Sequence, residues 1–205
     1  MIQNVIFDIG NVLMDFRWMD YMHSLFGEDG QTITIVNQAI WRQGTWASMD
    51  EGADENTAIE KAVRLVPTHE TEIRKAFSRA GQAMHRQDYA IPWIQELKHM
   101  GKNVFYLSNY SAFSIKANQD VLDFLPYMDG GVFSYQVRMV KPNPAIYRLL
   151  CEKYNLNAEE CLFTDDMPDN IAAAQECGFH TVLFEGYGKS YPAIMGAIQA
   201  NDNGE

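Results

Sequence analysis

The sequence predicts an α/β fold with a doubly wound parallel sheet and an inserted α-helical cap. Four short apolar runs are continuous rather than alternating, which is typical of strands buried on both faces of a parallel sheet. They cover residues 4–7, 104–107, 161–164 and 181–184. Helical patterns separate the later runs, and such alternation implies right-handed crossovers in a Rossmann-like sheet.

The connections between the later runs carry start and end signals of helices. The expected helices cover residues 91–100, 143–154 and 168–177. Gly101 follows the first and suits a helix C-terminus, as Gly178 does for the third. Asn143 and Pro144 suit the N-cap and first turn of the second, and Pro168 suits the start of the third.

The segment between the first two strands is long and has no convincing strand pattern. Residues 16–88 instead show helical periodicity, with an apolar face over residues 55–66. About seventy residues are too many for a simple connection between neighbouring strands. We therefore expect residues 1–15 and 89–205 to form the core, and residues 16–88 to form a helical cap above the carboxyl edge of the sheet.

Composition and charge restrict the partners of this 205-residue chain. Its 27 acidic and 16 basic residues give a formal net charge of −11. Such a surface repels nucleic-acid backbones and anionic lipid, so we expect neither nucleic acid nor membrane as a partner. No apolar window is long enough for a membrane span, and we expect no signal peptide. The three cysteines lack metal-like spacing and fit reduced thiols in a cytoplasmic monomer or homodimer.

Polar and charged residues follow the predicted strands, where an open α/β sheet places its ligands. They are Asp8 after the first strand, Ser108 and Asn109 after the second, Lys141 before the helix at 143, and Asp165 and Asp166 after residue 164. Because the carboxyl ends of parallel strands meet at one edge of the sheet, we expect these side chains to converge.

This set predicts phosphoryl transfer. Carboxylates held close together repel one another unless a cation joins them, and an all-oxygen ligand set favours a hard ion such as Mg²⁺. Such an ion lets a phosphate and a carboxylate approach each other. Lys141 can add fixed positive charge, and the Ser108 hydroxyl can donate to a phosphoryl oxygen. Asp8 can then attack phosphorus and form an aspartyl-phosphate.

The ordered set resembles the four motifs of the haloacid dehalogenase (HAD) superfamily. Residues 7–12 are similar to its first motif, 107–109 to its second, 141–142 to its third and 163–166 to its fourth. The resemblance covers about residues 2 to 185. It implies a sheet with the strand order 5-4-1-2-3.

The resemblance also implies roles for individual residues. Asp8 is the expected nucleophile and a metal ligand. The expected metal set is completed by the Gly10 carbonyl, Asp166 and Asp165, the last either directly or through a bound water. The residues expected to bind the phosphoryl group or substrate are Gly10, Asn11, Ser108, Asn109 and Lys141.

Within the superfamily, the first and fourth motifs look most like those of glucose 1-phosphate phosphatases and of the phosphatase domain of soluble epoxide hydrolases. Residues 49–55 resemble the cap segment that faces the active site in these relatives. Trp41, Trp46 and Met49 are therefore candidates for the wall of a substrate pocket, although packing inside the cap explains each of them as well.

Gly10 is the main departure from the family pattern. Most family phosphatases carry a second aspartate at this position, which protonates the leaving oxygen and then activates water. Such acid–base help contributes about 10²–10⁴-fold to a rate. Its absence favours a substrate with a good leaving group, such as a sugar 1-phosphate. Asp15 or the cap residue Glu51 are alternative acids.

The expected function is thus Mg²⁺-dependent hydrolysis of a small phosphorylated metabolite. Two alternatives remain open. One is a 2-haloacid dehalogenase-like hydrolase. That chemistry needs no metal, so it does not explain the adjacent pair Asp165 and Asp166. The other is a non-catalytic module that binds a phosphorylated ligand and lost turnover together with its acid.

Overall fold

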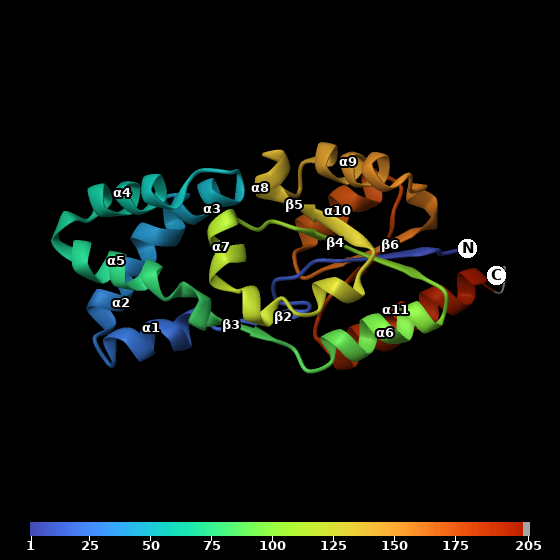
Figure 1. Cartoon of the computed structure of the whole chain (residues 1–205), viewed down its shortest axis with the longest axis horizontal. Helices are drawn as coiled ribbons and strands as arrows, with labels where there is room; N and C mark the ends of the chain where they lie inside the picture. The colour runs from blue at the N-terminus through green and yellow to red at the C-terminus, as the bar shows by residue number, and fades with distance from the viewer. Residues whose placement is uncertain (203–205) are drawn as a thin grey trace.

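A five-stranded parallel sheet forms the centre of one half of the molecule in our computed structural model, which describes residues 1–202 (Figure 1). Its strands are β1 (Asn4–Phe7), β4 (Asn103–Ser108), β5 (Gly130–Phe133), β6 (Cys161–Asp165) and β7 (His180–Leu183). Their spatial order is β5-β4-β1-β6-β7, with every pair parallel. Numbered along the chain and read from the β7 edge, this is the predicted order 5-4-1-2-3.

Helices cover both faces of this sheet, as a doubly wound fold requires (Figure 1). The covering helices are α6 (Ala90–His99) and α11 (Tyr187–Asp202) on one face, and α9 (Pro144–Tyr154) and α10 (Pro168–Glu176) on the other. Neighbouring residues of β1 point to opposite faces: Phe7 packs in the cluster with Trp93 of α6, and Ile6 packs in the cluster with Tyr147 of α9.

The residues predicted to start and end helices do so in the structure. The Asn143 side chain accepts a hydrogen bond from the backbone N–H of Ala145, and Pro144 occupies the first turn of α9. Gly101 follows α6 with a φ of 78°, in the left-handed region that favours glycine. The expected cysteine state also holds, because Cys151, Cys161 and Cys177 are all free.

Helices make up the other half of the molecule (Figure 1). We call residues 18–83 the helical region. It contains α1 (Trp18–Phe26), α2 (Gly30–Asn37), the π-helix η1 (Gln38–Arg42), α3 (Thr45–Asp50), α4 (Glu55–Leu65), η2 (Pro67–His69), α5 (Glu70–Ser78) and η3 (Ala80–Ala83). The region has its own hydrophobic cluster, in which Met22, Ile33 and Phe77 are buried. The predicted apolar face of α4 packs into it through Ala58 and Ala62.

The expectation that residues 16–88 contain no strand is wrong at both ends. β2 (Met14–Phe16) pairs antiparallel with β3 (Met84–Arg86), and this small ribbon joins the helical region to the sheet. Strands of three residues are too short to show a two-residue period in the sequence. The edge strand β5 was missed as well, because Gly130 and Gly131 interrupt its apolar pattern.

Short helices fill the remaining connections of the described chain. They are α7 (Ala112–Ala117), η4 (Gln119–Val121), η5 (Leu125–Tyr127), α8 (Ser134–Val137) and η6 (Ala158–Glu160). Within residues 1–202, no helix combines the length and the apolar character needed to cross a membrane.

The contact between β5 and β4 gives a prediction for stability. A Cβ on Gly131 would lie 2.3 Å from the Tyr106 carbonyl oxygen, whereas a Cβ on Gly196 in α11 would meet no heavy atom within 4 Å. We expect Gly131→Ala to lower the free energy of unfolding by about 1–3 kcal/mol. Gly196→Ala should raise it by roughly 0.5–1 kcal/mol, because alanine favours a helix interior. Urea unfolding measures both, and wild-type stability of Gly131→Ala would contradict the prediction.

Candidate active site

Three carboxylates converge where β1 and β6 end. One oxygen from each of Asp8, Asp165 and Asp166 lies within 4.8 Å of the other two. Asp8 and Asp165 are buried, and Asp166 is partly exposed. An all-oxygen donor set of this kind suits a hard divalent cation, and the mutual repulsion of three carboxylates also favours one. These residues therefore fit the predicted metal.

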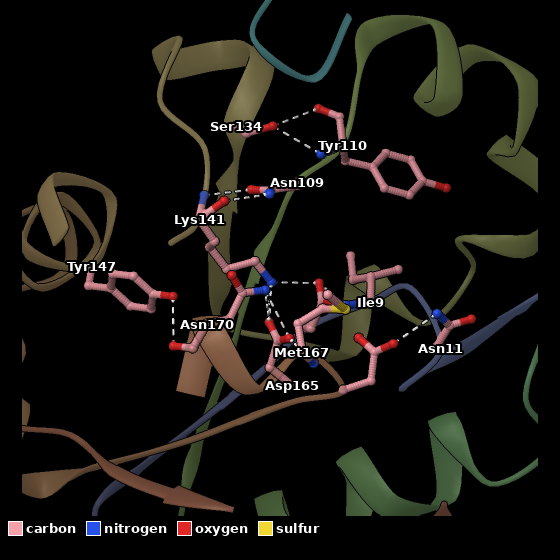
Figure 2. A network of polar contacts seen from close by, with 12 residues as sticks. Ile9, Asn11, Asn109, Tyr110, Ser134, Lys141, Tyr147, Asp165, Met167 and Asn170 are labelled. Atoms are coloured by element: carbon pink, nitrogen blue, oxygen red, sulfur yellow. Dashed lines mark hydrogen bonds and ion pairs between the residues drawn. The ribbon is translucent and has the colours of Figure 1, made fainter. Parts of the chain in front are cut away.

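The buried ammonium of Lys141 lies between two of these carboxylates. Its Nζ is 2.9 Å from Asp8 Oδ1 and 2.5 Å from Asp165 Oδ2 (Figure 2). Burial of the ammonium works against its charge, but Asp8 and Asp165 outweigh that effect and raise the pKa of Lys141. The lysine therefore carries a fixed positive charge at the bottom of the site.

Asp165 is held by a full set of hydrogen bonds. Its Oδ1 accepts from the Met167 N–H at 2.8 Å and from Asn170 Nδ2 at 2.9 Å. Its Oδ2 accepts from Lys141 and, at 3.0 Å, from Asn170 Nδ2. Tyr147 donates to the Asn170 carbonyl and continues this network toward α9 (Figure 2). Since a carboxylate has about four lone-pair positions, Asp165 has little capacity left for another partner.

Asp166 is less constrained. Its Oδ2 accepts a hydrogen bond from Asn11 Nδ2 at 2.9 Å. Asn11 takes a φ of 55°, a left-handed conformation that asparagine tolerates better than most residues. The turn after β1 thereby brings the Asn11 amide to the acidic pair (Figure 2).

The surroundings of Asp8 have opposing effects on the pKa of its carboxyl. It is 8% exposed, and its Oδ1 accepts from the Ile9 N–H at 2.7 Å. Burial raises the pKa of Asp8 to about 6, against the lowering effect of Lys141 and of a hydrogen bond from Ser108. The repulsion from Asp165 adds to the increase. A bound cation would favour the carboxylate form that nucleophilic attack requires.

Asn109 of the second predicted motif positions Lys141 of the third. Asn109 Nδ2 donates to the Lys141 carbonyl at 2.9 Å, and the Lys141 N–H donates to Asn109 Oδ1 at 2.8 Å. This amide pair fixes the backbone of Lys141 relative to the end of β4 (Figure 2). The structure therefore brings Asp8, Asn11, Asn109, Lys141, Asp165 and Asp166 together at one edge of the sheet.

A cavity of about 410 Å³ opens beside Asp8. Its polar lining includes Asp8, Gly10, Asn11, Asp50, Ser108 and Asn109. Its remaining lining is largely aromatic and apolar, with Phe16, Trp41, Trp46, Met84, Tyr110, Phe113 and Met167. The volume is typical of a small-molecule site, and a few polar groups in an apolar wall are typical of its chemistry.

Two of the three candidate wall residues do line the cavity. Trp41 and Trp46 stack with ring centroids 4.8 Å apart, and Phe113 of α7 lies edge-on to Trp46. Met49 instead is fully buried in the cluster of the helical region. Phe113 was not predicted, because nothing in the sequence indicates that α7 reaches the helical region.

The sequence analysis also missed Asp50 as a residue of the cavity. This side chain is partly buried at the end of α3. Burial, together with the charges of Asp8 and Glu51, raises the pKa of Asp50 to about 7. The two proposed alternative acids are elsewhere: Asp15 forms an ion pair with Arg17 at 2.6 Å, and Glu51 is exposed and outside the cavity lining.

Comparisons with known proteins agree with this geometry. Residues 2–178 match the family model of haloacid dehalogenase-like hydrolases. The chain is 24% identical over 209 residues to Phosphatase MT3486 of Mycobacterium tuberculosis, covering 95% of this chain and 92% of that protein. It is 23% identical over 191 residues to (S)-2-haloacid dehalogenase 4A of Burkholderia cepacia, covering 86% and 80%.

A solved structure of a HAD family enzyme has a similar fold. A HAD family enzyme of Bacteroides thetaiotaomicron, solved in complex with magnesium and inorganic phosphate, superposes with a TM-score of 0.69. The two sequences are 19% identical, and the superposition covers 89% of this chain and 94% of that one. The family model matches residues 2–178, which is most of the chain, and the four motifs meet at one sheet edge. The chain therefore belongs to the haloacid dehalogenase-like hydrolases.

Proposed function

We propose that this hydrolase is a Mg²⁺-dependent phosphatase of small phosphorylated metabolites, acting through an aspartyl-phosphate on Asp8. The observation that carries the proposal is that Asp8, which lines the cavity, lies close to both Asp166 and the buried Lys141 ammonium. The similarity to a phosphatase, and to a structure that holds magnesium and phosphate, supports the same reaction.

Each residue has a role in this proposal. Asp8, Asp166 and the Gly10 carbonyl would hold the metal, which would supply positive charge that lets two anions approach. Asp8 is the nucleophile. Asp165 belongs to the metal site chiefly as the group that orients Lys141, because its oxygens already accept four hydrogen bonds. The residues that bind the phosphoryl group are Asn11, Ser108, Asn109 and Lys141.

Our proposal for the substrate is based on the residues that line the cavity. We assign residues 16–88 the role of a cap, since Trp41, Trp46 and Asp50 of this segment line the same cavity as Asp8. Among small phosphate monoesters we favour sugar 1-phosphates. Gly10 offers no acid from the core, and an anomeric oxygen departs with less protonation than an ordinary alkoxide.

A 2-haloacid dehalogenase is the second candidate, because the chain resembles the Burkholderia cepacia enzyme. Both reactions begin with attack by an aspartate. Dehalogenation needs no metal, so it gives no role to the acidic cluster that Asp165 and Asp166 form with Asp8. This cluster therefore favours the phosphatase.

Replacing the nucleophile tests the proposal. Asp8→Asn is expected to lose roughly 10⁴–10⁶-fold in phosphate release, as removal of an enzyme nucleophile does. Acid quenching should trap a labelled acyl-phosphate on the wild type and none on the variant. EDTA should abolish the activity, and Mg²⁺ should restore it. Asp169→Asn, which removes an exposed acid near the site, is the matched control and should keep wild-type activity.

Two results would contradict this expectation. Halide release from a 2-haloacid in the presence of EDTA would identify a dehalogenase. Stoichiometric binding of phosphate without any turnover would identify a non-catalytic module.

Removing the buried ammonium tests the charge network. Lys141→Met leaves Asp8 and Asp165 without their shared cation, and loss of one partner of a buried ion pair costs about 3–5 kcal/mol. The pKa of Asp8, which burial already raises, should then rise further, so stability is kept at low pH and lost as pH increases. In urea unfolding with EDTA, the deficit should be larger at pH 8 than at pH 5. Lys189→Met on the surface is the control, and an equal deficit at both pH values would contradict the argument.

Leaving-group chemistry tests the choice of substrate. At equal concentration and with Mg²⁺, glucose 1-phosphate should be hydrolysed faster than glucose 6-phosphate, because its anomeric oxygen is the better leaving group. Phosphate release measures both rates. Faster hydrolysis of glucose 6-phosphate would remove the support for sugar 1-phosphates.

A further inference from the structure

We propose that Asp50 is the general acid and base of this site, supplied by the helical region in place of the aspartate that the core lacks at Gly10. The inference rests on the proposed phosphatase function and adds a catalytic residue to it.

The first support is the position of the side chain. Asp50 lines the same cavity as Asp8, although the two come from α3 and β1. The charge of Asp8 acts on Asp50 and helps to raise the pKa of its carboxyl. Among residues 1–202, no group donates a hydrogen bond to the Asp50 carboxyl, in contrast to Asp8 and Asp165. Asp50 can therefore donate its proton to a ligand in the cavity without losing a protein partner.

The second support is the way the backbone of Asp50 is anchored to the core. The fully buried Ser134 at the start of α8 donates from its hydroxyl to the Asp50 carbonyl at 2.6 Å. The same hydroxyl accepts from the Tyr110 N–H at 3.0 Å, just after β4 (Figure 2). Gly52 approaches α8 so closely that a Cβ would lie 3.3 Å from the Tyr135 carbonyl oxygen. The end of α3 is thus fixed against the sheet edge that carries Asp8.

The third support is the protonation of the carboxyl. The charged groups facing it are Asp8 from β1 and Glu51 on its own segment, while Arg138 of the α8 end lies beside Gly52. Tyr110 also faces it and stays neutral, because burial and then the nearby carboxylates raise its pKa. Burial raises the pKa of Asp50 to about 7, and an acid–base catalyst works best when its pKa is near the working pH.

The proposed steps are balanced. Asp8 forms a bond to phosphorus while the bond from phosphorus to the leaving oxygen breaks, and the Asp50 proton moves to that oxygen and gives an alcohol. Water then attacks the aspartyl-phosphate while the Asp50 carboxylate takes a proton from it. The bond from phosphorus to Asp8 breaks, inorganic phosphate forms, and Asp8 and Asp50 return to their starting states.

The test compares Asp50→Asn with the wild type and with Glu51→Gln, which removes the exposed neighbouring carboxyl. On glucose 6-phosphate, whose alkoxide needs a proton, kcat of Asp50→Asn should fall by about 10²–10⁴-fold. Glu51→Gln should stay within twofold of the wild type. The rate ratio of glucose 1-phosphate to glucose 6-phosphate should widen in Asp50→Asn, which loss of packing alone would not produce.

A second substrate separates the acid from the base. p-Nitrophenolate leaves without protonation, so Asp50→Asn should release one equivalent of it from p-nitrophenyl phosphate in a rapid burst. Slow turnover should follow, because the intermediate then lacks its base. On glucose 6-phosphate, whose leaving group needs the proton, the basic limb of the wild-type pH profile should be absent in Asp50→Asn. Asp50→Ser is measured alongside and should behave in the same way, so the conclusion does not depend on the folding of one variant.

The outcomes distinguish the two proposals. Wild-type phosphatase activity that survives in Asp50→Asn and Asp50→Ser overturns the role of Asp50 and leaves the proposed function intact. Absence of Mg²⁺-dependent phosphatase activity in the wild type overturns the proposed function, and the role of Asp50 with it.

Discussion

The buried ammonium of Lys141 is the interaction on which the site depends. Asp8 and Asp165 lie in a low-dielectric environment at the ends of neighbouring strands, where two unpaired carboxylates would repel each other strongly. Lys141 contacts both, and Asn109 fixes its backbone through a pair of hydrogen bonds. The order of the sheet makes this possible, because β4, β1 and β6 are neighbours although they are far apart in the sequence.

The sheet and its charged residues were predictable because both leave local signals. A buried parallel strand is a continuous apolar run, and Asp8 and Asp165 stand directly after such runs. Lys141 stands just before the start signal of a helix. The bounds of β1 were predicted to the residue, and those of the other three predicted strands to within one residue. Of the five strands of this sheet only β5 was not predicted, since Gly130 and Gly131, which pack closely against Tyr154 and Tyr106, also remove its apolar pattern.

The wall of the cavity was less predictable because tertiary packing creates it. Trp41 and Met49 look alike in the sequence as large apolar residues of a helical segment, yet the first lines the cavity and the second is buried in the helical cluster. Asp50 and Glu51 are adjacent acids, and only the rotation of α3 decides which one faces the site. The contact between Ser134 and the Asp50 carbonyl is equally invisible, because it joins residues 84 positions apart.

The acidic cluster has a consequence for the order of binding. The three acidic side chains of Asp8, Asp165 and Asp166 are opposed by the one ammonium of Lys141, so the site carries an excess of negative charge before any ligand arrives. A phosphate ester approaching this site alone meets repulsion from the groups that must later contact it. A cation held by Asp8 and Asp166 would reduce this repulsion, so in the proposed reaction the ester would bind well only to the loaded site, and inorganic phosphate would leave more readily when the cation is scarce.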